Sequence, residues 1–324
     1  YITTTIHEVS VFIQNVKGEL AAFRNVCPHR FSALKSEEKG NGKLLCPYHS
    51  WSFKVCGKVK AIPKKKEFNF SEDELEQIFL EKWAVDTCGE FVFVKRHDDG
   101  PNLKDTLGDY AEHLEEFSMY LGDKVDENEI IMECNWKIAL ENTLESYHVP
   151  RIHATTFAKL GSAGNNFGFT EKHSNWQTAL DPQVSKKVKK LKKLLGTVSK
   201  EVDGYIHYLF YPNMTLACSF GSSFAVQEFV PLGKDKTKFI SHVFLPKHEN
   251  ITEAKQALLD SFAHDMSAFN RKVFNEDKVI CGEVHLGCKN GWNQDGYLCT
   301  AENRVAAFQK HYLSDMQSLA IYLF

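Results

Sequence analysis

Two short loops near the start of the chain contain the residue types best suited to redox chemistry. Cys27-Pro28-His29-Arg30 and Cys46-Pro47-Tyr48-His49 each contribute one cysteine and one histidine, with sixteen residues between the two sets. Zinc modules usually place two cysteines in one loop and two histidines in the other. A loop with one of each suits a [2Fe–2S] cluster whose first iron binds both cysteines and whose second iron binds both histidines. The predicted cluster ligands are Cys27, His29, Cys46 and His49.

A second set of metal-binding residue types lies between residues 142 and 153. Asn142, Glu145 and His148 are three residues apart, which places them on one face if the stretch is helical. Pro150 cannot continue such a helix, so the break can turn His153 back toward His148. With a distant carboxylate, the two histidines would complete a 2-His-1-carboxylate iron site with open positions for dioxygen and substrate. A helix with two structural histidines is the alternative that this stretch alone leaves open.

The elements around the two loops are predicted to form a small β domain. Strand-like runs lie at residues 9–13, 20–23, 43–45, 51–53 and 91–94. Tight-turn signals lie at residues 17–19, at 41–42 and near Gly57. We therefore expect the ligand loops at the tips of hairpins.

A domain boundary is predicted at Asp98-Asp99-Gly100-Pro101, because Gly-Pro ends both strands and helices. It divides the chain into residues 1–98 and 99–324. Helical periodicity follows at residues 102–121, 135–148, 251–282 and 301–324, and strand-forming residues dominate 167–245. A central antiparallel sheet backed by helices, after a β domain, is an α+β arrangement.

A lysine-rich segment at residues 186–193 is predicted to form a basic amphipathic helix, with Val184, Val188, Leu191 and Leu195 on one face. It can be a solvated helix over the sheet or a docking site for an acidic electron-transfer partner. Nucleic-acid binding is disfavoured because no stacking aromatics lie between the lysines.

Composition narrows the class of protein. The 324 residues are 43% hydrophobic and 25% charged, which suits two packed domains. A net charge of −3 gives no general attraction to nucleic acid or anionic membranes, and no apolar run approaches the roughly 20 residues of a membrane helix. Nine scattered cysteines predict reduced thiols in the cytoplasm. Because the sequence begins at Tyr1 rather than methionine, we expect a segment to precede it.

Together these motifs resemble the catalytic α subunit of Rieske non-haem iron oxygenases, the ring-hydroxylating oxygenase family. The resemblance covers essentially the whole chain and rests on C-P-H-R, C-P-Y-H-S-W, Asn135-Trp136-Lys137 and the E-x-x-H-x-x-x-x-H motif that ends at His153. It implies a Rieske domain followed by a helix-grip (START-like) catalytic domain. It also implies a cluster on the four ligands named above and a mononuclear Fe(II) on His148 and His153, with Arg30 and Trp51 supporting the cluster loops.

The resemblance places the third iron ligand in a late helix. Asp277 is the first choice, Glu276 the second and Glu283 the third, and a solvated helix acid is the alternative for each.

Glu145 departs from the family pattern, which usually has aspartate at that position. In the family this carboxylate bridges a cluster histidine of one subunit to an iron histidine of the next, so His49 would meet Glu145 of a neighbouring chain. The resemblance therefore implies a homotrimer. Glutamate at this position resembles the carnitine-type oxygenases, which act on quaternary ammonium substrates.

The implied activity is that of a terminal oxygenase component that uses O₂ and a small-molecule substrate. Electrons would come from NAD(P)H through a separate reductase, with or without a ferredoxin. The substrate would be an arene that is hydroxylated or a quaternary amine that is demethylated or cleaved, since aromatic rings bind both kinds of molecule. The candidate lining residues are Phe167, Phe169, Tyr205, Tyr208, Phe210, Phe220 and Phe224. A Rieske-type electron carrier with a non-catalytic ligand-binding domain, and a binding module without iron, are the alternatives.

Overall fold

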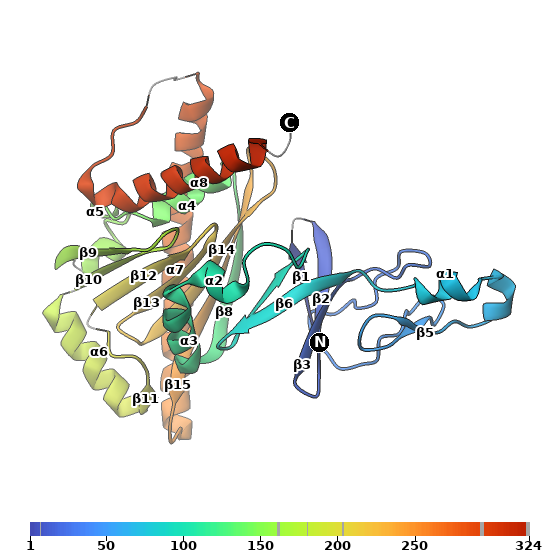
Figure 1. The fold of residues 1–324 in the computed structure, drawn as a ribbon. Helices are drawn as coiled ribbons and strands as arrows, with labels where there is room; N and C mark the ends of the chain where they lie inside the picture. The colour runs from blue at the N-terminus through green and yellow to red at the C-terminus, as the bar shows by residue number, and fades with distance from the viewer. Residues whose placement is uncertain (7, 161–162, 180, 203, 292–294, 322–324) are drawn as a thin grey trace. The chain divides into compact units, whose positions relative to one another are not determined.

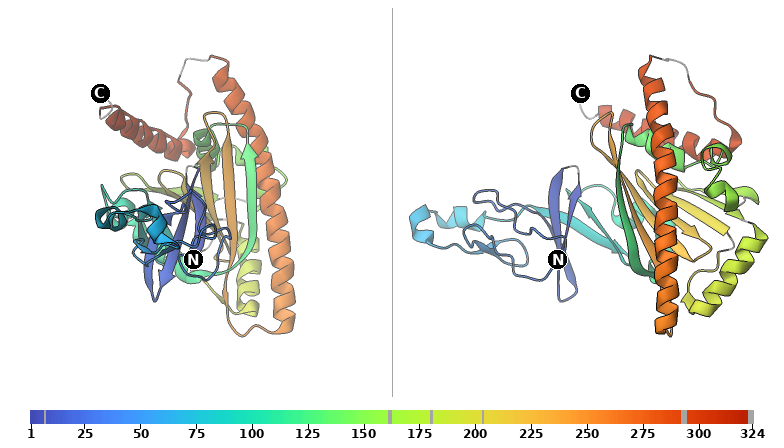
Figure 2. Two further views of the ribbon diagram at one scale, coloured as in Figure 1. Left: turned by 90° about the vertical axis from the view of Figure 1, so that its right-hand side faces the viewer. Right: turned by 180° about the vertical axis from the view of Figure 1, so that it is seen from behind.

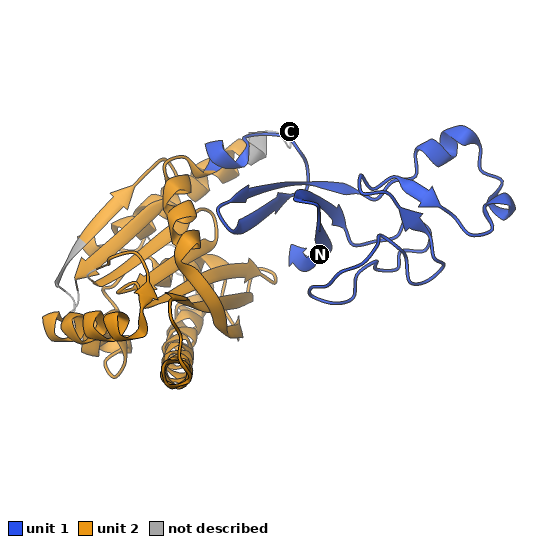
Figure 3. Ribbon diagram, turned by 90° about the horizontal axis from the view of Figure 1, so that it is seen from below, with its two compact units in different colours: residues 1–106 blue, residues 107–324 orange. Residues whose placement is uncertain are grey.

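The computed structural model describes residues 1–6, 8–160, 163–179, 181–202, 204–291 and 295–321. The chain divides into two compact units, residues 1–106 and 107–324 (Figure 3). Among the helices of the described residues, none combines the length and the hydrophobicity of a membrane-spanning segment.

The first unit is built on antiparallel strands. Five strands form a sheet in the order β1-β2-β3-β6-β7, and β4 pairs with β5. The elements of this unit are β1 (Ile2–Ile6), β2 (Val9–Val16), β3 (Glu19–Arg24), β4 (Ser52–Phe53), β5 (Val59–Ala61), η1 (Lys65–Phe68), α1 (Glu72–Glu76), β6 (Lys82–Cys88) and β7 (Phe91–Lys95). The predicted hairpin is confirmed, because β2 and β3 pair across a turn at Lys17 and Gly18, where both φ angles are positive.

The predicted strand at residues 43–45 is wrong. Only an isolated bridge joins Leu45 to Ser52 there. Leu44 is buried in the core beneath the two ligand loops, while Leu45 is exposed. The short segment therefore anchors a loop through one side chain rather than extending the sheet.

The second unit is an eight-stranded antiparallel sheet with helices on both faces (Figure 1). Seven strands follow the order β11-β15-β14-β13-β12-β10-β9. β8 also pairs with β15, along the edge opposite β14. The strands are β8 (Leu121–Met132), β9 (Ala163–Phe169), β10 (Ser174–Ala179), β11 (Thr197–Val198), β12 (Gly204–Phe210), β13 (Met214–Ser219), β14 (Ser223–Pro231) and β15 (Thr237–His248). The predicted α+β fold is confirmed.

The long helix α7 runs along one face of this sheet, as Figure 2 shows from behind. The helical segments are α2 (Leu103–Leu107), α3 (Tyr110–Tyr120), α4 (Trp136–Thr143), α5 (Val149–Ile152), η2 (Phe157–Leu160), α6 (Pro182–Leu195), α7 (Glu253–Lys289), η3 (Thr300–Glu302) and α8 (Asn303–Ile321). The basic segment is confirmed as helical: in α6, the Asp181 side chain accepts amide hydrogen bonds at the first turn, and Gly196 follows the last residue with a positive φ.

Two helix predictions need correction. The segment 102–121 is two helices, α2 and α3, because Gly108 adopts a positive φ of 52° that interrupts the helix. The helix predicted at 135–148 ends at Thr143, so Glu145 and His148 lie in the connection after α4. Pro150 lies in the first turn of α5, where a missing amide donor costs nothing.

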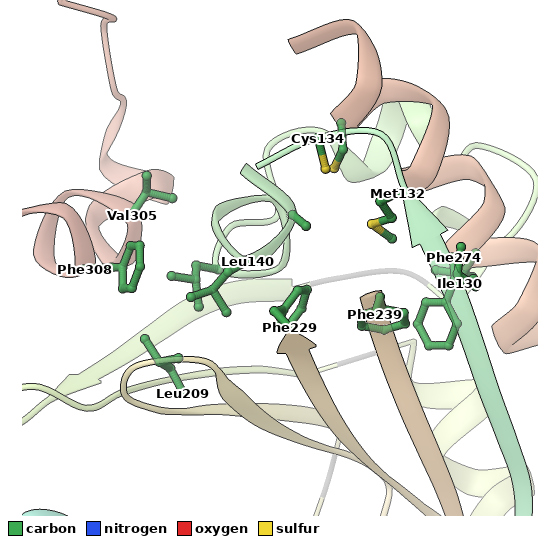
Figure 4. Close-up of a cluster of buried hydrophobic side chains, with 14 residues drawn as sticks. Ile130, Met132, Cys134, Leu140, Leu209, Phe229, Phe239, Phe274, Val305 and Phe308 are labelled. Carbon is green, nitrogen blue, oxygen red and sulfur yellow. The ribbon is translucent and has the colours of Figure 1, made fainter. Parts of the chain in front are cut away.

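The main core lies between the sheet and helices α4, α7 and α8 (Figure 4). Leu140 of α4 and Phe229 of β14 are fully buried there, together with Phe308 of α8 at 1% exposure. Phe239 packs edge-on against Phe274 of α7, with ring centroids 4.8 Å apart. This packing fixes α4 and α7 against each other and positions the side chains described next.

Candidate metal centres

The two cysteine–histidine loops have the same backbone geometry. In each loop the cysteine amide donates to the carbonyl five residues later, from Cys27 to Ser32 and from Cys46 to Trp51, at 2.8 Å in both cases. The cysteine carbonyl accepts from the amide four residues later, and that residue has a positive φ in both loops: 61° at Phe31 and 58° at Ser50. Non-glycine residues seldom adopt this conformation. Its occurrence twice shows that both loops are bent to present their side chains in the same way.

The four predicted ligands face one another. Cys27 and Cys46 are each 1% exposed, and the rings of His29 and His49 have centroids 4.7 Å apart. Nδ1 of both histidines is buried and meets no hydrogen-bond partner among the described residues. Burial, and then the neighbouring Cys46, raises the pKa of the Cys27 thiol to about 11. Two unpartnered imidazole nitrogens beside two buried thiols fit a metal cluster, since metal ions would satisfy the nitrogens and lower the thiol pKa.

Trp51 and Arg30 lie where supporting residues would be expected. The Trp51 indole stacks on the His29 imidazole, with centroids 4.8 Å apart and planes 3° from parallel. The Arg30 guanidinium lies 5.8 Å from the centroid of the Tyr48 ring. Asn25, which sequence reasoning missed, accepts the amides of Leu34 and Lys35 at 2.9 Å and so holds the chain that leaves the first loop.

The second centre begins where α4 ends. A carboxylate oxygen of Glu145 accepts the backbone amides of Tyr147 and His148, and the other oxygen bonds Nδ1 of the His148 ring. These bonds replace the helical carbonyl acceptors and so account for the early end of the helix. The chain then turns through α5, and His153 follows at its C-terminal end, 3% exposed.

Helix α7 supplies the third residue of the second centre, Asp277. Oδ1 of Asp277 lies 3.0 Å from Nε2 of His153 and 3.7 Å from Nε2 of His148. One ligand atom from each of these three residues lies within 4.8 Å of the others. Asn142 of α4 donates to the same Asp277 oxygen at 2.8 Å, so the carboxylate is oriented before any metal is bound.

Both histidines are oriented with Nε2 toward Asp277. Nδ1 of His148 bonds Glu145, and Nδ1 of His153 lies 2.8 Å from an oxygen of Glu276. A carboxylate can only accept, so each Nδ1 carries a proton, and Nε2, the nitrogen that faces Asp277, is the atom of each ring that a metal ion would bind. A carboxylate behind a metal-binding histidine also fixes the ring and increases its basicity. The donor set and its orientation therefore fit a mononuclear metal ion.

Burial and the neighbouring carboxylates shift the pKa of His153 in opposite directions. Burial lowers the pKa of His153, but hydrogen bonds and charge from Asp277 and Glu276 outweigh it and hold the pKa above its ordinary value. Burial raises the pKa of Glu276, but hydrogen bonds from His153 and Thr156 hold it below its ordinary value. Thr156 donates to Glu276 at 2.7 Å, a partner that the sequence did not reveal.

Glu283 and three of the candidate lining residues lie away from the His148–His153–Asp277 group. Glu283 is exposed on α7 and is not one of the three residues that come together. Tyr208, Phe210 and Phe224 were predicted as pocket residues, but their rings pack on the opposite face of the sheet against Tyr110 and Phe117 of α3. Of the predicted lining residues, Tyr205 is connected to the second centre, through Phe157.

Two protein-family models match this chain, and between them they cover most of both compact units. The family model described as "Rieske [2Fe-2S] domain" matches residues 1–84, and the one described as "Ring hydroxylating alpha subunit (catalytic domain)" matches residues 104–318. The chloroplastic choline monooxygenase of Beta vulgaris is 28% identical over 95% of this chain, which spans 66% of that protein's length.

Two solved structures show the same fold. A quaternary ammonium Rieske monooxygenase, described for its carnitine oxidation and inter-subunit electron transfer, superposes with a TM-score of 0.75 at 21% identity. That match covers 95% of this chain and 82% of the other. Naphthalene 1,2-dioxygenase from a Rhodococcus species superposes with a TM-score of 0.71 at 17% identity, over 97% of this chain and 85% of the other.

Proposed function

Because the chain belongs to the ring-hydroxylating α-subunit family, with a Rieske [2Fe–2S] domain before the catalytic domain, we propose that it is the terminal oxygenase component of a Rieske-type oxygenase. The observation that carries this proposal is the convergence of His148, His153 and Asp277 within the catalytic domain. We assign residues 1–98 to the cluster and residues 99–324 to the oxygenase chemistry.

The ligand assignment follows from which atoms are free to bind. Cys27, Cys46 and Nδ1 of both His29 and His49 would hold the cluster, since those nitrogens have no other partner in the described parts of the chain. Nε2 of His148 and His153 and the carboxylate of Asp277 would hold one Fe(II). When bound, the two groups supply electrons and dioxygen activation respectively.

Glu276 is assigned a supporting role rather than ligation. Its carboxylate bonds Nδ1 of His153, on the side of the ring away from Asp277. Glu145 has the same relation to His148. The two acids hold the Nδ1 side of each ring, so Nε2 is the nitrogen that is directed toward the metal.

A homotrimer is proposed in which His49 of one subunit meets Glu145 of the next. Exposed aromatic rings next to both residues support it: Tyr48 is 55% exposed and Tyr147 is 70% exposed. Large exposed rings of this kind are enriched at subunit interfaces. A short hydrogen-bonded route through Glu145 would then serve electron transfer between subunits.

NAD(P)H would supply the electrons through a separate reductase, with or without a ferredoxin. Within the part of the chain that the structure describes, the nine cysteines form no disulfide, which agrees with the reducing conditions of the cytoplasm.

The substrate that we favour is a quaternary amine, oxidised at a carbon next to nitrogen. Glutamate at position 145 and the similarity to quaternary-ammonium oxygenases support this choice. Arene hydroxylation is the second candidate, favoured by the aromatic rings of Phe157 and Tyr205 beside the second centre. In both reactions the chain binds and orients the substrate beside the His148–His153–Asp277 triad.

The test combines metal content with oxygen consumption. Anaerobically reconstituted protein is expected to hold about three irons per chain, two in the cluster and one at the second centre. With a reductase, carnitine or glycine betaine is expected to stimulate oxygen uptake and benzoate is not. Two irons per chain in fully loaded protein would refute the oxygenase assignment. Stimulation by benzoate alone would replace the amine with an arene.

A further inference from the structure

A buried arginine without a negatively charged partner lies on the sheet face that carries the second centre. Arg304 is in the first turn of α8 and has 0% exposure. Its Nε and Nη2 donate to the side chain and carbonyl of Ser174 at 3.0 and 3.3 Å, and its Nη1 donates to Nδ1 of His207 at 3.2 Å. Among the described residues, every hydrogen-bond partner of this guanidinium is neutral.

An unneutralised buried charge is costly, and a structural role does not require one. Burial lowers the pKa of Arg304 to about 9, opposed only by Tyr110 and Tyr205. Joining α8 to Ser174 could be achieved by a neutral donor at far lower cost. The charge is therefore accounted for if an anion that binds to the protein neutralises it.

His207 presents a second unpaired donor at the same place. It is 3% exposed, and burial followed by the charge of Arg304 holds its pKa well below its ordinary value. Because Nδ1 accepts from Arg304, the proton of the neutral ring lies on Nε2. That Nε2 is buried, and no described residue provides it with a hydrogen-bond acceptor. The guanidinium and the Nε2–H together make a donor-rich position that suits a carboxylate.

A succession of rings joins this position to the second centre. His207 and Tyr205 lie two residues apart in β12, on the same face, with ring centroids 6.3 Å apart. Tyr205 contacts Phe157 at 5.5 Å, and Phe157 contacts His153 at 6.1 Å. The residue opposite His207 in β13 is Ala217, and the residue opposite it in β10 is Trp176, whose ring packs on Tyr205 at 5.4 Å. The imidazole therefore has its small neighbour on the β13 side.

We infer that Arg304 and His207 bind the carboxylate of the substrate, and that the substrate is therefore a trimethylammonium carboxylate of the betaine type. This inference rests on the proposed oxygenase function and narrows it. The rings of Tyr205 and Phe157, between the two ends, suit the cationic head through cation–π attraction. A molecule held at its carboxylate by Arg304 would direct its methylated nitrogen toward His148, His153 and Asp277. Choline has no carboxylate and would lack this anchor.

The experiment compares a carboxylate ligand with its uncharged primary amide. Calorimetric titration of the full-length, iron-loaded protein under anaerobic conditions would measure the Kd of carnitine and of carnitine amide. The wild-type protein is expected to bind the acid at least about tenfold more tightly, as charge-assisted hydrogen bonds predict. Arg304→Gln should abolish this preference, and Arg304→Lys should keep part of it.

Ser174→Ala is the matched control. It removes a hydrogen bond that attaches Arg304 to the sheet but leaves the charge, so the preference for the acid should persist. If Arg304→Gln does not fold, His207→Leu provides the test, because it removes the Nε2–H donor, together with the Nδ1 acceptor of Arg304, but keeps the guanidinium, and it should reduce the preference several-fold. Equal affinity of the wild type for acid and amide, or an unchanged preference in His207→Leu, would overturn the inference.

The benzoate and benzamide pair separates this inference from the choice of substrate. A preference for benzoate over benzamide that depends on Arg304, with no binding of carnitine, would support an anion site and remove the betaine assignment. Failure of the oxygenase proposal itself would appear instead in the iron content, which this titration does not use as its readout.

Discussion

Replacing Glu276 by glutamine tests the arrangement of the second centre most directly, because it separates a supporting carboxylate from a ligand. The Glu276 carboxylate lies 2.8 Å from Nδ1 of His153 and accepts a second bond from Thr156 at 2.7 Å. Glutamine keeps an oxygen that can accept the Nδ1 proton but loses the negative charge. The tautomer is thus retained while the basicity of the ring falls.

The expected cost can be estimated. Loss of a carboxylate behind a metal-binding histidine typically weakens metal affinity about 10- to 100-fold, or roughly 1.4 to 2.7 kcal/mol. The assay is an anaerobic competition for Fe(II) between the protein and a chelator, with the EPR signal of the reduced cluster as an internal reference. Thr156→Val is the matched control: it removes the other bond to Glu276 but leaves the charge, so a smaller loss of affinity is expected.

Two results would refute this reasoning. Complete loss of mononuclear iron in Glu276→Gln, equal to the loss in Asp277→Ala, would make Glu276 a ligand. Unchanged Fe(II) affinity would show that the bond to His153 does not support the metal.

Three further outcomes are expected. Asp277→Ala should reduce the iron content from about three to about two per chain and leave the cluster EPR signal intact; Glu283→Gln, an exposed acid of the same helix, should change neither. Glu145→Gln, loaded with saturating Fe(II), should slow oxidation of the pre-reduced cluster about 10- to 100-fold in a single-turnover stopped-flow experiment, and an unchanged rate would exclude Glu145 from the electron route. Leu140→Ala, which opens a cavity in the main core, should lower the free energy of unfolding by about 2–5 kcal/mol in urea titration. The exposed Leu194→Ala should stay within about 0.5 kcal/mol.

The cluster loops could be predicted because all four ligands lie within a short stretch of chain, where the order of residue types determines the chemistry. The second centre could be predicted only in part. His148 and His153 are local, but Asp277 is more than a hundred residues away, and the adjacent Glu276 remained the second choice for the same role. Packing of α7 decides between adjacent acids, and that packing involves residues from the whole domain.

The pocket residues could not be assigned because the sheet is covered on both faces. β12 is buried along almost its whole length, so the alternation that would separate its two faces is lost from the sequence. Tyr205 and Tyr208 therefore look alike in the sequence, although one lies on the face of the second centre and the other packs against α3. Arg304 was missed for a related reason: an isolated arginine in a helical segment gives no sign that it will be fully buried.

The rotation of α7 about its axis decides which carboxylate serves which imidazole nitrogen. Phe274, Asp277 and Cys281 follow one another at steps of three and four, so they share the buried stripe of the helix. Glu276 is turned from that stripe by about 100° and reaches the other side of the His153 ring. A rotation by one residue would move Asp277 out of the stripe and bring Glu276 or Lys278 into it. Because Phe274 and Cys281 are packed in the main core, core packing and ligand geometry in this domain are fixed by the same contacts.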